Sequence, residues 1–533
     1  MQRKWWTLLA VCLATFMLLL DITIVNVALP DIADELDASF SDVQWVIDAY
    51  ALTLAALLLT AGSLADLVGR RLVFAIGLVC FTAASLLCAI APSATALILA
   101  RGAQGIGGAA MFATSLALLA QEFHGPERGT AFGLWGATTG AAVAIGPLVG
   151  GALTDALGWP SIFYLNLPIG LATIAITLRK LPESRDEEAA AIDWLGLTTF
   201  SAALFLLVYG LIQGNEHGWD SGLIAGSLVA SALLLVLFVV VERRQLRPMF
   251  DLSLFRKPTF GGSSIAAFAL SASMFAMFLY LTLYLETILD YGPLETGLRF
   301  LPVTALSFVA AAISGNLTAR LPARGLLGGG LLLVAIGLLL MRGLDTSSEW
   351  TALLPGFVVA GIGIGTINPS IANTAIGVVA PARAGMASGI SSTFRQVGIA
   401  TGIAGLGAVF QSQVSDRLGS ALAGTAAAAH ASDIGRAVTS GGAARAVAAA
   451  PPAGRPQLDR AIHAAFAAAL DDLLLIAGVV AFVGAVLAFW LVREGDFVGH
   501  GAGVAPQEDE QPESTEAPPQ GVESVRVRPA ETG

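Results

Sequence analysis

The sequence predicts an all-α protein that crosses a membrane many times. Of its 533 residues, 56% are hydrophobic and only 13% are charged. Long apolar runs recur along the chain, close to the roughly 20 residues that a helix needs to cross the hydrocarbon core of a bilayer. The first run, residues 5–29, is longer than the apolar part of a signal peptide and lacks a small-residue cleavage site after it. We therefore expect it to remain as the first transmembrane helix.

About fourteen runs satisfy this length rule. They are expected near residues 5–29, 43–63, 72–91, 95–121, 129–153, 161–179, 194–213, 222–241, 260–286, 297–318, 325–342, 351–375, 387–411 and 470–492.

Basic residues alternate with these runs and indicate the orientation. If the runs alternate in direction, one side collects most of the loop Lys and Arg residues, beginning with Arg3, Lys4, Arg70 and Arg71. The positive-inside rule then predicts a multi-pass protein of the plasma (inner) membrane with both termini in the cytoplasm. The loop at about 412–465 carries five arginines on the other side, but long loops do not follow the rule.

An internal repeat divides the chain. The 29 residues from Gly105 align without gaps with those from Gly361, and GSLADLVGRR at Gly62 has a degenerate echo in GNLTARLPAR at Gly315. We expect two copies of a six-helix bundle, residues 1–180 and 258–493, with two inserted helices in 181–257. Residues 494–533, with nine acidic residues and two arginines, are expected to form a disordered acidic tail.

Three charges lie inside apolar runs: Asp21, Asp48 and Arg101. A carboxylate at the centre of a bilayer costs about 2.5 to 3.5 kcal/mol on insertion scales, so such residues face other protein groups or water. Their depths along the helices predict one shared polar pocket in which a carboxylate loads and releases a proton. A merely structural buried acid is the alternative for Asp21.

Two further stretches combine small residues with turns or bends. The loop after the second run contains Gly62, Asp66, Gly69, Arg70 and Arg71. In the fifth run the small residues stand at helical spacing beside a helix-bending proline, at Gly140, Gly146, Pro147, Gly150 and Gly151. Such spacing lets two helices approach closely, and a generic packing face is the alternative interpretation.

These motifs resemble the major facilitator superfamily, and in particular its fourteen-helix drug:proton antiporter branch of the EmrB/QacA type. Further matches are LDITIVNVALP around Asp21, FYLNLPIG from Phe163, PMFDLSLF from Pro248 and TFRQVG from Thr393. The resemblance implies two pseudo-symmetric bundles that alternate between faces of the membrane. It also implies that residues 140–151 form the antiporter motif, and that Asp66 docks near residues 384–388 as a conformational latch. Leu67 departs from the family's loop signature, where a basic residue is usual.

Candidate residues for a substrate cavity are Gln104, Glu286, Asn368, Asn373, Arg395 and Gln396. Polar contacts between packed helices explain the Asn, Arg and Gln residues of the second half equally well. Glu286, where the branch more often has glutamine, is either one partner of a rim ion pair near Arg299 and Asp290 or an additional cation or proton site.

Several function classes find no support in the sequence. No P-loop is present, the five histidines are scattered, and the three cysteines fall in predicted membrane helices. We expect a monomeric transporter that is not an enzyme, contacts lipid but not nucleic acid, holds no metal or cofactor, and draws on a proton gradient. The predicted substrate is a hydrophobic or cationic small molecule. A dedicated exporter of an endogenous metabolite or antibiotic, and a non-transporting receptor or scaffold, are the alternatives.

Overall fold

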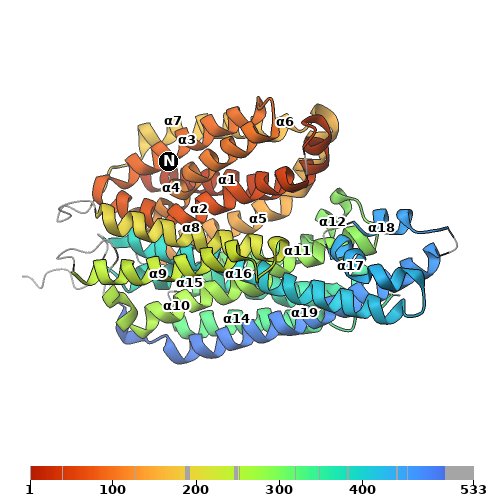
Figure 1. Ribbon diagram of the computed structural model, residues 1–533. Helices are drawn as coiled ribbons and strands as arrows, with labels where there is room; N and C mark the ends of the chain where they lie inside the picture. Colours follow the sequence, from red (N-terminus) through yellow and green to blue (C-terminus); the bar gives the residue numbers. More distant parts are fainter. Residues whose placement is uncertain are drawn as a thin grey trace, which may run out of the picture. The chain divides into compact units, whose positions relative to one another are not determined.

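The computed structural model describes residues 2–497 except 39, 125, 186–192, 245–249, 251, 319, 347, 381–382, 440–441 and 453, and over these residues it contains helices and no strand (Figure 1). In this part of the chain twelve helices are long and apolar enough to cross a membrane. Two further predicted spans are occupied by α5 (Pro126–Leu157) and α13 (Leu301–Leu317), in which the described residues include the shorter apolar stretches Leu148–Leu157 and Leu301–Gly315.

The first part of the chain forms a bundle with its own core. Beside α5 it contains α1 (Arg3–Glu35), α2 (Phe40–Val68), α3 (Arg70–Ala89), α4 (Ala94–Glu122), α6 (Pro160–Tyr164) and α7 (Asn166–Lys180). Helix α4 packs against α2 and α3, and α1 packs against α5. Ser93 begins α4 by accepting a hydrogen bond from the Ala96 amide, which satisfies one free donor of the first turn.

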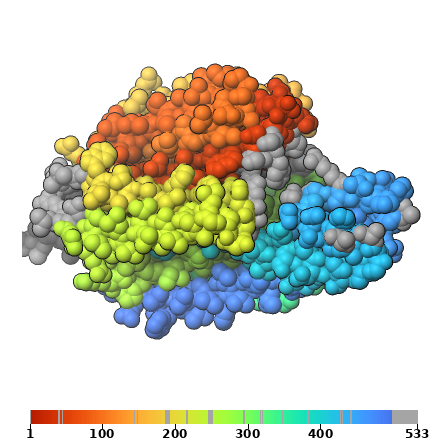
Figure 2. All heavy atoms as spheres, viewed as in Figure 1, coloured from red at the N-terminus to blue at the C-terminus, as the bar shows by residue number. Residues whose placement is uncertain are grey.

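The inserted pair, α8 (Trp194–His217) and α9 (Gly222–Arg244), forms a hairpin that contacts both the first and the second bundle through α8. Helix α8 packs against α2 on one side and α16 (Ala384–Ala421) on the other. Phe200, Phe238 and Phe250 form the aromatic centre of a core shared with Leu59 and Ile390. Figure 2 shows this hairpin, in yellow and yellow-green, between the red-orange and the green-blue parts of the surface.

The second bundle contains one helical rod with two irregular stretches. The predicted span at 260–286 is divided into α10 (Pro258–Leu270), η2 (Ser271–Phe275), α11 (Ala276–Leu283) and η3 (Tyr284–Ile288), and both η segments are wide, π-helical turns. Helices α12 (Pro293–Arg299), α14 (Ala323–Leu340), α15 (Leu354–Gly377), α16 and α19 (Arg455–Leu491) complete this bundle. Wide turns of this kind are frequent at functional sites.

The predicted outer loop at 412–465 is largely helical. Helix α16 has 38 residues, about 57 Å at 1.5 Å per residue, and so extends well beyond a hydrocarbon core of about 30 Å. Helices α17 (Ala431–Thr439) and α18 (Ala443–Ala449) pack beside the extended ends of α16 and α19. The buried residues Leu418, Leu422, Val438, Leu458 and Ile462 continue the core into this extension, which the sequence could not indicate because its Ala and Gly composition lacks strong periodicity.

The described chain also continues past the predicted start of the acidic tail. Residues Glu494–Asp496 form a short helical turn, η7. Glu494 accepts a hydrogen bond from the Ala323 amide at 2.9 Å, and Asp496 accepts one from the Thr259 amide at 3.2 Å. These acids therefore cap the first turns of α14 and α10, where a negative charge is favourable. The remainder of the predicted tail, from residue 498, lies outside the described residues.

Candidate functional site

Asp21 is the centre of a buried polar cluster. Its side chain is 1% exposed on α1, and Arg101 of α4 forms an ion pair and a hydrogen bond with its Oδ2. Its Oδ1 accepts hydrogen bonds from Gln104 Nε2 at 2.8 Å and from Asn166 Nδ2 at 2.9 Å. Three donors from α4 and α7 thus converge on one carboxylate, which meets the requirement that a buried charge be paired and hydrogen-bonded.

Arg101 is held by more than the carboxylate. Its Nε donates to the Val46 carbonyl oxygen at 3.0 Å and its Nη1 donates to Gln104 Oε1 at 2.7 Å. The guanidinium lies 4.3 Å from the centre of the Tyr50 ring, an arrangement in which the ring face attracts the cation. Arg101 therefore keeps several partners whether or not Asp21 carries its charge.

Asn166 is a member of this cluster that sequence reasoning missed. It lies at the start of α7, directly after the short helix α6, and also donates to Ser85 Oγ at 3.3 Å. The signal was present in FYLNLPIG, because an asparagine within an apolar run needs a partner. Sequence alone could not show that this partner lies 145 residues away on α1.

Asp48 does not share this pocket as the sequence predicted. Val46 and Tyr50, four residues apart on one face of α2, both contact Arg101. Asp48 lies between them, about 200° around the helix from Val46, and accepts a hydrogen bond from Gln213 Nε2 of α8 at 3.0 Å. The prediction used only the distance of Asp48 along α2. It was wrong because Asp48 lies on the face of α2 that points to α8.

The small residues of the fifth run bring α5 against α1 next to this cluster. A Cβ on Gly146 would overlap Thr23 Oγ1, and one on Gly150 would lie 2.9 Å from Ile24 Cγ1. Gly151 is less tightly packed, with Val27 Cγ1 at 4.0 Å. Pro147 lies within α5, and its side chain is outside the described residues. The close approach of α5 therefore occurs two and three residues after Asp21.

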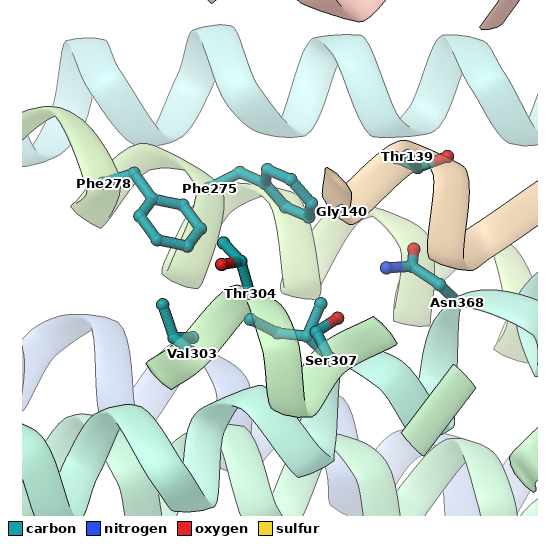
Figure 3. A pocket seen from close by; sticks show the side chains of 9 residues that line it. Thr139, Gly140, Phe275, Phe278, Val303, Thr304, Ser307 and Asn368 are labelled. Atoms are coloured by element: carbon teal, nitrogen blue, oxygen red, sulfur yellow. The ribbon is translucent and has the colours of Figure 1, made fainter. Parts of the chain in front are cut away.

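A small cavity lies between the two bundles (Figure 3). Its wall contains Thr139 and Gly140 of α5, and from the second bundle Phe275, Phe278, Val303, Thr304, Ser307, Ile364 and Asn368. Its volume of about 20 Å³ is enough for roughly one water molecule. The cavity is partly open to its surroundings, and α5 supplies one wall and the irregular rod another.

The other predicted cavity residues are distributed unevenly. Arg395 is buried and its Nη1 donates to Asn368 Oδ1 at 3.0 Å, so these two predicted residues lie together beside the cavity. Asn373 and Gln396 are half-buried and do not belong to its wall. Gln104 belongs to the Asp21 cluster instead.

Glu286 is half-buried in the wide turn η3. The predicted rim ion pair with Arg299 is wrong for the described residues, because Arg299 instead places its guanidinium 3.4 Å from the centre of the Tyr291 ring and donates to the Glu295 carbonyl oxygen. The alternative interpretation, an additional cation or proton site at Glu286, stays a prediction.

At one end of the bundle Asp66 binds the beginning of α16. Its Oδ1 accepts a hydrogen bond from the Gly385 amide at 3.0 Å and its Oδ2 accepts one from the Met386 amide at 2.8 Å. Arg70 forms an ion pair with the same carboxylate at 2.8 Å. The contact expected near residues 384–388 is therefore present, and free amides of a first helical turn are a favourable site for an anion.

The predicted loop is helical except at Gly69, because Gly62 and Asp66 lie in α2 and Arg70 and Arg71 begin α3. Its two glycines permit the contact with α16. A Cβ on Gly62 would lie 2.5 Å from the Gly385 carbonyl oxygen, so α2 and α16 touch through their backbones. Gly69 adopts φ +133°, a conformation that other residues rarely reach, and its Cα faces the Glu183 carboxylate. Arg71 donates through Nη2 to the Leu178 carbonyl oxygen at 2.8 Å, which fastens the loop to the end of α7.

The comparison with protein families decides the classification of the fold. Residues 11–403 match the family model described as Major Facilitator Superfamily. The chain belongs to the major facilitator superfamily. The expected all-helical major facilitator fold and the superfamily are therefore confirmed, and the fourteen-helix branch stays a prediction. The protein is a multi-span membrane protein of a transporter family.

Relatives within this superfamily carry names of resistance and export proteins. The chain is 38% identical to "Multidrug resistance protein Stp" of Mycobacterium tuberculosis (strain CDC 1551 / Oshkosh) over 413 residues, which covers 77% of each chain. It is 33% identical to "Tetracenomycin C resistance and export protein" of Streptomyces glaucescens over 496 residues, which covers 92% of this chain and 91% of the relative.

A solved structure shows the same fold at low identity. The human organic anion transporter MFSD10 (TETRAN) matches with a TM-score of 0.59 and 15% identity, over 90% of this chain and 100% of that chain. This likeness concerns the fold alone.

Proposed function

We propose that this superfamily member exports hydrophobic or cationic compounds in exchange for protons, by alternating access. The observation that carries the proposal is the buried cluster in which Arg101, Gln104 and Asn166 all donate to Asp21. An ionisable group at membrane depth is costly and commonly marks the path of a proton or ion. The names of the relatives support export as the direction.

Helix α5 connects the proton site with the substrate site. Its Gly146 packs against Thr23, two residues after Asp21, and its Gly140 lies in the wall of the cavity. A change at Asp21 that shifts α1 must therefore also displace α5, because the Gly146 contact leaves no space between the two helices. Proton binding and substrate binding then compete through a shared rigid element.

Protonation of Asp21 removes the ion pair without releasing Arg101. The guanidinium keeps the Val46 carbonyl oxygen, Gln104 Oε1 and the Tyr50 ring as partners. Breaking one partner of a buried pair ordinarily leaves a costly unpaired charge, and these remaining contacts reduce that cost. Asp21 is therefore the group that changes charge during the cycle, and Arg101 stays charged and positions it.

The cavity suits a ligand with a large apolar surface. Phe275, Phe278, Val303 and Ile364 supply aromatic and aliphatic walls, and Thr139, Thr304 and Ser307 supply hydroxyl groups. A mostly apolar pocket with a few polar groups is typical of small-molecule sites. The cavity, at about 20 Å³, is far smaller than a drug-sized ligand, so binding requires its walls to move apart.

Transport by purified protein in proteoliposomes tests the proposal. With an imposed pH gradient and ethidium as a lipophilic cationic probe, the wild type is expected to drive ethidium against its concentration gradient. Asp21→Asn is expected to abolish this driven transport but to keep ethidium exchange without a pH gradient. Asp31→Asn, on the exposed end of the same helix, is the matched control and should behave as wild type. Unchanged driven transport by Asp21→Asn contradicts the proposal.

A dedicated exporter of one antibiotic is the second candidate. It is favoured by the match to the tetracenomycin C resistance and export protein, which spans 92% of this chain. The same proteoliposomes with tetracenomycin C and ethidium separate the two. Transport of several unrelated compounds supports the multidrug function, and transport of a single compound supports the dedicated one. Flux of any of them excludes a receptor or scaffold that does not transport.

We also propose that the protein works as a monomer in the plasma membrane with both termini in the cytoplasm. Arg3, Arg71, Arg179 and Lys180 gather where α1 begins and α7 ends, and the positive-inside rule assigns that end to the cytoplasm. Labelling of a single cysteine introduced at Gln2, in intact cells and in inverted vesicles, tests the orientation. Labelling only in inverted vesicles is expected, and labelling in intact cells contradicts the assignment.

A further inference from the structure

A basic groove lies at the end of the first bundle, apart from the Asp21 cluster and the cavity. It has a volume of about 410 Å³. The start of α1 supplies Arg3 and Trp6 to its wall, and α3 supplies Arg71. The end of α7 supplies Leu178, Arg179 and Lys180. Three helices thus direct four cations and an indole ring to one place.

These four cations form no ion pair with any described residue. Lys4, their sequence neighbour, is in contrast paired with Glu127 at 2.7 Å. The nearby carboxylate of Glu183 accepts hydrogen bonds from the Arg71 amide at 3.0 Å and the Leu72 amide at 3.1 Å. Glu183 therefore offsets at most one of the four charges, and the groove keeps a surplus of positive charge.

Trp6 gives the groove an interfacial character. Lys180 Nζ lies 5.9 Å from the centre of its ring, within the range in which an aromatic face attracts a cation. Tryptophan is enriched at the level of lipid headgroups, where its ring contacts apolar groups and its N–H contacts polar ones. We therefore expect the groove to lie at the level of the headgroup phosphates.

Exposed apolar residues of α3 and α7 lie next to the groove and farther along both helices. Leu72 and Ile76 of α3 are 45% and 58% exposed, and Leu171 and Leu178 of α7 are 62% and 53% exposed. Helices α3 and α7 pack side by side. Because each residue advances 1.5 Å, Leu171 lies about 13 Å along α7 from Lys180, so this surface is long enough for part of an acyl chain.

We propose that the groove binds the headgroup of an anionic phospholipid, with its acyl chains along α3 and α7. Arg and Lys bind phosphate oxygens through charge-assisted hydrogen bonds, and basic pockets between membrane helices on the cytoplasmic side bind anionic headgroups. A free phosphate would use the cations but not the apolar surface, which is why a lipid is the occupant that fits both. The site does not depend on transport, but it rests on the cytoplasmic placement of this end that is proposed above.

Native mass spectrometry of the full-length protein tests the proposal. The purified protein is given a mixture of phosphatidylglycerol and phosphatidylcholine, and selective retention of phosphatidylglycerol is expected.

The groove variant combines Arg3→Gln, Arg179→Gln and Lys180→Gln, and leaves Arg71 in place because it binds the Leu178 carbonyl. At about 1 kcal/mol per basic residue, its affinity for phosphatidylglycerol should fall roughly 100-fold. The matched control combines Arg243→Gln, Arg244→Gln and Arg324→Gln, exposed cations outside the groove, and should retain the lipid.

Two further arms identify the occupant. Excess inorganic phosphate should not displace phosphatidylglycerol, since the apolar contacts hold the lipid; full displacement overturns the lipid assignment. If acids of the tail filled the groove instead, changing Glu508, Asp509 and Glu510 to their amides would raise lipid retention severalfold. No change in that variant is expected. Equal retention by the groove and control variants also overturns the proposal.

Quenching of tryptophan fluorescence locates the lipid with a variant that keeps all the charged residues of the groove. Brominated phosphatidylglycerol in nanodiscs should quench the part of the emission that Trp6→Phe removes, and brominated phosphatidylcholine should quench it less. The Phe variant keeps an aromatic ring, so folding is preserved. Equal quenching of the Trp6 emission by the two lipids contradicts the assignment, even if the triple variant fails to fold.

Discussion

Two helix crossings close the same end of the bundle, and they differ in charge. Where α2 meets α16, Gly62 touches Gly385 and the Asp66 carboxylate binds the amides of the first turn. Where α5 meets α13, a Cβ on Gly129 or on Gly315 would overlap the carbonyl oxygen of the other. Both crossings are backbone contacts between the two bundles, but the described residues place a carboxylate at only the first.

The internal repeat explains why the two crossings look alike. In sequence Gly62 corresponds to Gly315, and Gly129 corresponds to Gly385. Each crossing therefore joins a glycine near the end of one helix, Gly62 of α2 or Gly315 of α13, to a glycine in the first turns of a helix from the other copy. Asp66 corresponds in sequence to Ala319, which lies outside the described residues. The comparison teaches that backbone contact is the common means of closure, and that the carboxylate fastens one crossing only.

Each crossing also contains a buried arginine with a different environment. Arg70 is 4% exposed and paired with Asp66. Arg128, at the beginning of α5, is 8% exposed, and its guanidinium lies 5.3 Å from the centre of the Phe132 ring. Its Nε and Nη2 have no hydrogen-bond partner among the described residues. The arginine of the first crossing therefore has a carboxylate partner, and the arginine of the second crossing has none among the described residues.

The largest effect is expected from the glycines that both crossings share. Gly129→Ala and Gly62→Ala should each prevent closure of this end, because the added methyl group meets a backbone oxygen that cannot move aside. Distances between spin labels across the end should lengthen, and driven transport should be lost. Gly329→Ala, where no atom lies within 4 Å, should match wild type. If this end still closes in Gly129→Ala, α5 and α13 are not packed closely enough at Gly129 for an added methyl group to separate them.

A smaller effect is expected from the carboxylate of the first crossing. Asp66→Asn keeps the shape but removes the charge from the amides of α16 and from Arg70, at about 1.5 to 3 kcal/mol for a charged hydrogen bond. The closed state should lose roughly tenfold to hundredfold in population, seen as a partial shift in the same distance distributions. An unchanged distribution would mean that the glycine contact alone maintains closure.

The smallest effect is expected from the arginine of the second crossing. Arg128→Gln should change the melting temperature by only a few degrees in either direction, since two of the three guanidinium nitrogens of this buried cation have no hydrogen-bond partner among the described residues. Arg70→Gln is the matched variant and should be clearly destabilising, because it leaves Asp66 without its ion-pair partner. Equal losses of stability in the two variants would remove the distinction between the crossings.

The sequence was sufficient for features that depend on composition and spacing. Apolar run length predicted the membrane-spanning helices, and family resemblance placed Asp66 at the beginning of α16. The two like bundles expected from the repeat stay a prediction. The sequence was insufficient where the position of a side chain depends on the rotation of its helix or on a contact with a distant part of the chain. The face of α2 occupied by Asp48, the contribution of Asn166 and the helical extension beyond the membrane all depend on tertiary packing, which periodicity along one helix does not specify.

The most direct test of the account is proton release when purified protein binds ethidium, followed with a pH-sensitive dye in weakly buffered detergent solution. The wild type is expected to release protons when it binds ethidium, and Asp21→Asn is expected to bind ethidium without release. Equal proton release by wild type and Asp21→Asn would contradict the claim that Asp21 carries the exchanged proton.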